Sequence, residues 1–286
     1  MKNKILILLA LLFTTGLIYT ACEKETEEDT TPDDTDVQAV IDNVKSEEAV
    51  ASTFNTVNHY GINEEGIKDL QADSVVITVD PCVLCDSFPK TMTIDFGNGV
   101  LGNDMVVRKG KIIAVFTGRW GRTTLAAGTE VEISYDNFYV NNVKRTGTVI
   151  ASYNGENSYG GPSFSTEAVD LKMIFTDGSE TVLNGTRTYD WIEGYSDLSQ
   201  TNDVFEVSGT MTGVDRDGKT YTSAIADGSP LLRDNTCEDT YTFTSGVLEI
   251  TPEGKSSRTL DFGDGTCDNK IGINILGFET SITATP

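Results

Sequence analysis

The feature that most constrains this chain is a long succession of short strand-like runs that starts at Asp73 and continues to its last residues. Apolar and polar residues alternate within the runs, as in Glu130–Ile133, and this alternation is typical of a strand with one buried and one solvated face. Short segments such as Asn141-Asn142 and Asp177-Gly178 separate the runs and favour tight hairpin turns. About a dozen strands with such short connections predict an antiparallel meander, either one curved sheet or a two-layer sandwich.

A helical region, residues 37–72, precedes the predicted β domain of residues 73–286. Its apolar side chains recur at three- and four-residue spacing, as one face of a helix requires, at Val37, Val40, Ile41, Val44, Val50, Phe54 and Val57. We expect one or two helices that end by Gly61 or Gly66 and pack on the sheet, because a helix this short is rarely stable alone. The runs expected to be strands are 75–79, 92–96, 112–118, 129–140, 143–153, 164–175, 180–191, 204–214, 220–226, 240–250, 258–262, 271–276 and 278–283.

A five-residue turn occurs twice within the β domain, as Asp95–Gly99 and as Asp261–Gly265. Each copy follows a threonine and an apolar residue, and each precedes a run that opens on Lys-Ile and closes on Gly, at 111–118 and 270–277. Glycine supplies the positive φ that a tight turn needs, and an aspartate can bond the backbone of its own turn. The sequence therefore predicts two related strand–turn–strand units.

The first 21 residues have the features of a signal peptide. Lys2 and Lys4 supply a positive start, and residues 5–13 form an apolar stretch too short to span a bilayer as a mature helix. Small residues then lead into Cys22. These features predict export from the cytoplasm.

Residues 22–36 are expected to form a disordered acidic tether. No apolar side chain occurs from residue 23 to residue 36, so charge repulsion and the lack of buried surface both oppose folding. The whole chain has 44 acidic residues against 21 Lys and Arg residues, which gives a formal net charge of −23. Because this charge repels polyanions, we expect no nucleic-acid partner.

Several segments together resemble a known family. The residues around Cys22 resemble a bacterial lipobox, in which the cysteine is acylated and becomes the mature N-terminus. The acidic run behind it resembles a surface-export signal. The helical region, the two Asp-Phe-Gly turns and segments 135–141, 187–194 and 249–255 then follow in the order typical of a widespread family of surface lipoproteins of Bacteroidetes-type bacteria.

This resemblance covers nearly all of the mature chain. Tyr19 departs from the leucine usual in the lipobox, and Val100-Leu101 stand where the family often has a cysteine. The resemblance implies a lipid-anchored protein of the outer membrane, exposed at the cell surface and held to the membrane through the lipid on Cys22. It implies no particular chemistry.

Four cysteines follow Cys22, an even count that favours disulfides in an exported protein. A turn near Glu253 would place Cys237 and Cys267 at similar distances along a hairpin, so we predict a disulfide between them. Cys82 and Cys85 would then pair with each other or stay reduced. Their spacing also fits a redox motif or half of a zinc site, and these alternatives remain open.

No pattern of residues points to a catalytic group, a metal or a cofactor. His59 is the single histidine, and no nucleophile motif accompanies it, so we expect a surface or packing role. Asp215–Gly218 and the carboxylates Asp261, Asp264 and Asp268 resemble parts of a calcium loop. The bidentate glutamate of such a loop is missing, which favours ordinary hairpin turns. We therefore expect no catalytic residue, no metal and no cofactor.

The predicted function is a non-catalytic binding or structural module of the cell envelope, which holds a glycan or an envelope protein. A carboxylate-based glycan hydrolase or a glycan-binding lipoprotein is the alternative, since the sequence cannot show whether two acids reach the required separation. Six aromatic residues could stack on sugars or fill a core: Tyr135, Phe138, Tyr139, Tyr189, Trp191 and Tyr195.

Overall fold

The computed structural model describes residues 37–62, 75–81, 87–102, 105–120, 125–197, 199, 201–237 and 243–284. The described residues form one helix, α2 (Gln38–Ile62), and fifteen strands. The strands are β1 (Val76–Asp80), β2 (Lys90–Asp95), β3 (Val100–Leu101), β4 (Val107–Phe116), β5 (Glu130–Val140), β6 (Val143–Glu156), β7 (Pro162–Ile174), β8 (Glu180–Glu193), β9 (Val204–Val214), β10 (Thr220–Ile225), β11 (Leu231–Asp234), β12 (Ser245–Pro252), β13 (Arg258–Asp264), β14 (Lys270–Ile275) and β15 (Phe278–Thr283).

All fifteen strands belong to one antiparallel sheet, so the predicted mainly-β meander is confirmed and its single-sheet form is the one observed. Neighbours in the sheet follow chain order almost throughout, from β1 to β15. Two short strands, β10 and β11, both lie between β9 and β12 in the sheet. There β10 pairs with residues 210–214 of β9, and β11 pairs with residues 204–207.

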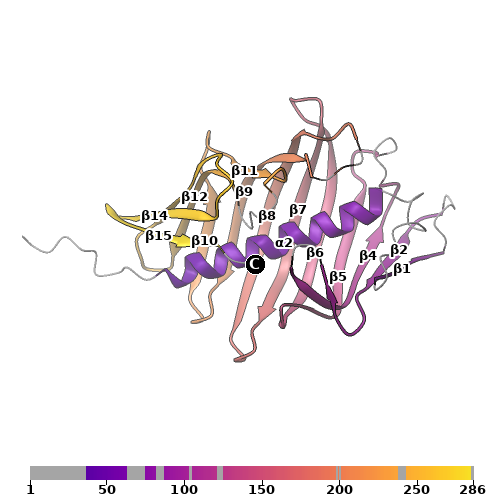
Figure 1. Ribbon diagram of the computed structural model, residues 1–286, viewed down its shortest axis with the longest axis horizontal. Coiled ribbons are helices and arrows are strands. Elements are labelled where there is room, and N and C mark those ends of the chain that lie inside the picture. The colour runs from indigo at the N-terminus through magenta and orange to yellow at the C-terminus, as the bar shows by residue number, and fades with distance from the viewer. Residues whose placement is uncertain are drawn as a thin grey trace, which may run out of the picture. The chain divides into compact units, whose positions relative to one another are not determined.

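The helix α2 lies across the strands on one face of the sheet (Figure 1). Its first half contacts the β8–β12 side, where Glu47 bonds Arg187 of β8. Its second half reaches the segment that follows β4, where the side-chain oxygen of Asn58 accepts a hydrogen bond from the indole of Trp120 at 3.1 Å. Among the described residues of α2, Lys45 is the one that is classed as exposed. The predicted helical region is therefore one deeply embedded helix, while residues 63–74 lie outside the described residues.

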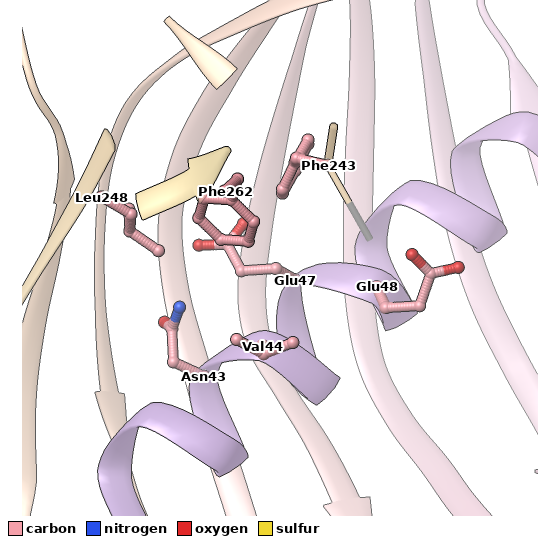
Figure 2. Close-up of a pocket in the computed structure, with 7 residues that line it drawn as sticks. All are labelled: Asn43, Val44, Glu47, Glu48, Phe243, Leu248 and Phe262. Atoms are coloured by element: carbon pink, nitrogen blue, oxygen red, sulfur yellow. The ribbon is translucent and has the colours of Figure 1, made fainter. Parts of the chain in front are cut away.

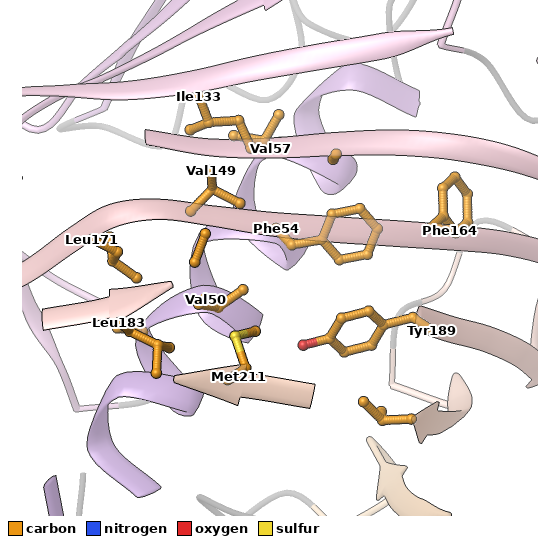
Figure 3. Packing of buried hydrophobic residues seen from close by; sticks show 14 of the residues in the cluster. Val50, Phe54, Val57, Ile133, Val149, Phe164, Leu171, Leu183, Tyr189 and Met211 are labelled. Carbon is orange, nitrogen blue, oxygen red and sulfur yellow. The ribbon is translucent and has the colours of Figure 1, made fainter. Parts of the chain in front are cut away.

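Apolar side chains from α2 and from the facing strands form the core (Figure 3). The ring of Phe54 lies 5.5 Å from that of Phe164 and 5.6 Å from that of Tyr189, measured between centroids. Phe164 belongs to β7 and Tyr189 to β8. Their side chains both reach the helix because every second residue of a strand points to the same face of the sheet. Burying a large apolar side chain stabilises a fold by about 1.5–3 kcal/mol, so these contacts hold the helix on the sheet.

The two Asp-Phe-Gly segments share one hydrogen bond from the backbone to the aspartate but differ in secondary structure, because the first forms a turn after β2 whereas Asp261–Asp264 lie inside β13. In Asp95–Gly99 and in Asp261–Gly265 the N–H of the third residue donates a hydrogen bond to Oδ1 of the first, at 2.8 Å in both. The phenylalanine of each segment, Phe96 and Phe262, is buried. The predicted turn is therefore found in the first copy and is wrong for the second, where the chain turns after Asp264 instead, while the phenylalanine of each copy joins the core.

The predicted disulfide between Cys237 and Cys267 is confirmed, with the two Cα atoms 5.2 Å apart. Its expected position across the ladder of a hairpin is wrong. The paired residues of β12 and β13 end at Ser245 and Asp264. Cys237 follows β11, and Cys267 lies between β13 and β14, so the bridge joins two connections beyond the ladder.

Candidate functional site

A buried ion pair fixes α2 on the inner face, by which we mean the sheet face that packs on the helix. Glu47 of α2 pairs with Arg187 of β8, and their side chains are 4% and 0% exposed. The guanidinium also donates to the carbonyl of Gly209 and to Oγ of Ser223. A buried charge is tolerated only when it is paired and hydrogen-bonded, and this pair meets both conditions. It therefore anchors the helix.

Two further ion pairs connect helix acids to the sheet. The Arg216 side chain donates to Asp42 at 2.8 Å, and the Arg216 backbone N–H donates to the same carboxylate at 2.9 Å. Arg233 of β11 lies 3.2 Å from Glu48, and both side chains are partly exposed. In addition, the buried guanidinium of Arg145 donates to the carbonyl of Ala49 at 3.2 Å. The helix is thus held on the inner face by specific polar contacts as well as by apolar packing.

A small cavity lies between α2 and the sheet (Figure 2). It is lined by Asn43, Val44, Glu47, Glu48, Phe243, Leu248 and Phe262 and has a volume of about 10 Å³. This volume is close to the least that can hold one water molecule. Both polar atoms of the Asn43 side chain are buried there without a hydrogen-bond partner in the described part of the chain. The cavity suits one water and is too small for an organic ligand.

A much larger hollow lies on the outer face, which is the sheet face turned away from α2. Its volume is about 600 Å³, and we call it the outer hollow. Because Leu183 and Met211 are buried in the core, the residues next to them in β8 and β9 point outward. The hollow is lined by Val182, Asn184, Thr212, Gly213, Val214, Thr220, Tyr221, Thr222, Thr251, Pro252, Glu253, Gly254 and Lys255.

The outer hollow presents mostly neutral polar chemistry. Threonine side chains from β9, β10 and β12 offer hydroxyl and methyl groups, and Asn184 adds an amide. Glu253 and Lys255 bring one negative and one positive charge from the turn after β12, and the Glu253 carboxylate accepts a hydrogen bond from Thr220. Such a surface can both donate hydrogen bonds to a hydroxyl-rich ligand and accept hydrogen bonds from it.

A second outer depression, which we call the acidic hollow, has a volume of about 460 Å³. It is lined by Glu206, Ser229, Pro230, Leu232, Ser245, Gly246, Val247, Asp261 and Gly263. The Tyr159 hydroxyl donates to the Glu206 carboxylate at 3.1 Å, and this hydrogen bond raises the pKa of Tyr159. Asp261 belongs to β13 and accepts the N–H of Gly263. Two carboxylates therefore border one depression.

The aromatic residues singled out in the sequence do not form a sugar-stacking face. Phe138, Tyr189 and Trp191 are buried in the core. Tyr135 packs against that core, and burial raises its pKa, while its hydroxyl lies 3.0 Å from Thr53 of the helix. On the loops and the outer face, the hydroxyl of Tyr195 donates to the carbonyl of Tyr159, and Tyr139 lies beneath the ammonium of Lys109.

The aspartates of the two candidate calcium loops bond the nearby backbone. Asp215 accepts the N–H groups of Asp217 at 3.0 Å and of Lys219 at 2.9 Å. Asp264 and Asp268 bond the backbone two residues further on in the same way. Within the described ranges no group of three or more His, Cys, Asp or Glu side chains is placed to hold a metal ion.

His59 lies near the end of α2, where its ring centroid is 5.0 Å from that of Tyr60. Burial lowers the pKa of His59 below its usual value of 6.5. The remaining sequence-predicted residues, Cys22, Cys82 and Cys85, lie outside the described residues.

No protein-family model, curated protein or solved structure matches the chain. In the part of the chain that the structure describes, no helix is both long enough and apolar enough to cross a membrane.

Proposed function

We propose that the protein is a lipid-anchored component of the cell envelope whose β domain binds a neutral glycan without turning it over. The anchoring part rests on Cys22 and the acidic segment behind it. The binding part rests on one observation, the outer hollow of about 600 Å³ lined by threonine, asparagine and backbone groups.

The chemistry of the outer hollow favours a glycan over other polymers. Hydroxyl and amide groups match the hydroxyls of a sugar, and the threonine and valine methyl groups match its C–H faces. A net charge of −23 opposes binding of a polyanion such as nucleic acid. The hollow is also preorganised, because the ion pairs of α2 hold the opposite face of the same strands, and a preformed site loses little entropy on binding.

An array of neutral polysaccharides tests the binding proposal. The protein would be residues 22–286 with Cys22→Ser, so that no lipid is attached. Thr212→Trp places a bulky ring inside the outer hollow and should weaken binding at least about tenfold, which corresponds to about 1.4 kcal/mol. Thr210→Trp is the matched control, because Thr210 is exposed on the same face of β9, two residues away, and does not line the hollow.

Retained affinity in Thr210→Trp together with a loss in Thr212→Trp would support the outer hollow as the site. If the unsubstituted protein binds no polysaccharide, or if both variants lose affinity equally, the proposal is wrong.

Anchoring is tested separately at Cys22. In cells, Cys22→Ala should leave the protein unacylated and either released or retained as a precursor. Metabolic labelling with a fatty acid and detergent partitioning would measure this change. A variant that still partitions into detergent like the parent protein would rule out acylation at Cys22.

Glycan hydrolysis is the second candidate, and the acidic hollow is the observation that favours it. Glu206 and Asp261 border one depression, as a pair of acids would in a glycosidase. Release of new reducing ends from a bound polysaccharide, abolished by Glu206→Gln and by Asp261→Asn, would replace the binding proposal with this one.

A further inference from the structure

The outer hollow is elongated across the strands. Its lining comes from β8, β9, β10 and β12, which lie side by side in this order in the sheet. Along β8, β9 and β10 it extends over only three residues each, as at 212–214 of β9. Four strands are separated by three spacings of about 4.8 Å, or roughly 14 Å in all, whereas three residues of a strand cover only about 7 Å. The long axis of the hollow is therefore perpendicular to the strands.

A row of polar side chains follows this long axis. Asn184 of β8 is paired with Thr212 of β9. Thr212 is paired with Thr222 of β10, and Thr222 is paired with Thr251 of β12. All four side chains point outward, because the residue before each of them in its strand is buried. The row thus presents one amide and three hydroxyl groups, one on each strand.

A second row lies beside the first, two residues away along each strand. Val182 is paired with Val214, and Val214 is paired with Thr220. The row ends at Glu253, whose N–H donates to the Thr220 carbonyl at 2.9 Å and whose carboxylate accepts the Thr220 hydroxyl. The hollow therefore has one hydrogen-bonding side and, over β8 and β9, one apolar side.

We propose that the outer hollow binds an extended, β-linked glycan whose chain lies across the strands, with about one sugar unit over each strand. This inference rests on the proposed function and names the class of glycan. The spacing of neighbouring strands, about 4.8 Å, is close to the length of one sugar unit in an extended chain. Hydroxyls along one edge of such a chain meet the polar row, and the C–H faces of its rings contact the valine methyl groups.

The same geometry disfavours an α-linked chain. Axial glycosidic bonds make a chain coil, so its successive units turn away from a row of side chains that continues over four strands. Equatorial bonds keep the chain extended, so each further unit reaches the next strand. Later contacts of one ligand cost little additional entropy of association, and affinity should therefore rise with each unit that reaches another strand.

Calorimetric titration with oligosaccharides tests the ligand class, with residues 22–286 carrying Cys22→Ser. The β-linked probes are cello-oligosaccharides and manno-oligosaccharides from the disaccharide to the hexasaccharide. Malto-oligosaccharides of the same lengths, which are α-linked, are the matched control. Affinity for a β-linked series should rise up to the tetrasaccharide and then level off, because the hollow spans four strands. Maltotetraose should bind at least about tenfold more weakly, which corresponds to about 1.4 kcal/mol.

Threonine-to-valine variants test the direction of the chain, because valine keeps the shape of threonine and its strand preference but lacks the hydroxyl. Thr222→Val and Thr251→Val should each weaken binding of the tetrasaccharide by about twofold to tenfold, as expected for the loss of one hydrogen bond. Thr210→Val is the matched control, since Thr210 is paired with Ala224 in the neighbouring row and does not line the hollow. It should bind like the unsubstituted protein, and all three variants should keep its unfolding midpoint in urea.

The direction is wrong if Thr251→Val leaves the affinity unchanged, and a loss in Thr210→Val would show a chain that follows β9 instead. The ligand class is wrong if malto-oligosaccharides bind as tightly as the β-linked series, or if neither β-linked series binds while another polysaccharide does. These results would leave the outer hollow as a glycan site. They are distinguishable from failure of the proposed function, in which no glycan binds or Thr212→Trp binds as well as the unsubstituted protein.

Discussion

Removing the Glu47 carboxylate should strongly destabilise the protein, because it leaves the buried Arg187 guanidinium without its counter-charge. In Glu47→Ala the guanidinium keeps its hydrogen bonds to Gly209 and Ser223 but stays 0% exposed. It cannot regain water without displacing α2. The same substitution also removes the contact that fixes the first half of the helix over β8.

The expected magnitude follows from the burial of the pair. Breaking a buried ion pair by removing one partner costs about 3–5 kcal/mol. For a domain of this size, 1 kcal/mol corresponds to about 2–4 °C in Tm, so the melting temperature should fall by roughly 6–20 °C. Glu48→Ala is the matched control, since it removes the next acid of the same helix, whose pair with Arg233 is 35% and 17% exposed. A partly exposed pair of this kind contributes only about 0–1 kcal/mol.

Equilibrium unfolding in urea, followed by circular dichroism and by tryptophan fluorescence, measures both losses. The double variant Glu47→Leu/Arg187→Met, which replaces the pair with apolar groups, should recover most of the stability lost in Glu47→Ala. If Glu47→Ala costs no more than Glu48→Ala, or if the double variant is as unstable as the single one, the buried pair does not anchor the helix.

Three further predictions concern other parts of the sheet. Loss of the disulfide in Cys237→Ser/Cys267→Ser should lower the free energy of unfolding by roughly 3–4 kcal/mol, since the bridge closes a loop with a sequence separation of 30 residues. Burial lowers the pKa of His59, so the unfolded chain binds its proton more readily, and stability should fall as the pH drops below about 6.5. In Gly213→Ala the added Cβ would lie 2.2 Å from the Tyr221 ring, which predicts a cost of about 1–3 kcal/mol.

Each of these predictions has its own control. Non-reducing peptide mapping must find the Cys237–Cys267 bridge before its removal is measured. His59→Gln should flatten the stability profile between pH 5 and pH 6.5, and an unchanged slope would exclude His59 as its source. Gly272→Ala, where the nearest atom to the added Cβ is 3.6 Å away, should cost much less than Gly213→Ala, and equal costs would contradict the packing argument.

The course of the sheet could be predicted from the sequence because alternation and turn chemistry are local signals. Asn141 and Asn142 have φ values of 46° and 68°, as their hairpin turn requires. Two strands were not predicted. β3 is only two residues long, and β11 is a four-residue strand that follows the short connection after β10. Neither is long enough to show a clear alternation of apolar and polar residues.

The polar contacts beneath α2 could not be predicted from the sequence. The helical pattern of residues 37–72 assigns no partner to Asp42 or Glu47, because nothing local in the sequence shows that Arg216 and Arg187 meet them. The Cys237–Cys267 pairing was predicted correctly for a geometric reason that does not hold, since both cysteines lie beyond the paired residues of β12 and β13.

The outer hollow was not predicted either. The only signal for it is the threonine alternation along β9 and β10, at Thr210, Thr212, Thr220 and Thr222, which marks outward-facing hydroxyls. A hollow arises only when several strands are placed side by side, and their placement depends on registers set by long-range pairing.

Carboxyl footprinting by mass spectrometry, with and without the polysaccharide that binds most tightly on the array, tests the proposed binding face most directly. The ligand should protect Glu253 in the outer hollow and leave Glu167, which is exposed on the same face of β7, fully reactive. Glu48 of the helix should also keep its reactivity, because α2 occupies the inner face. Protection of Glu48 with no change at Glu253 would place the ligand on the helix side of the sheet and contradict the proposal.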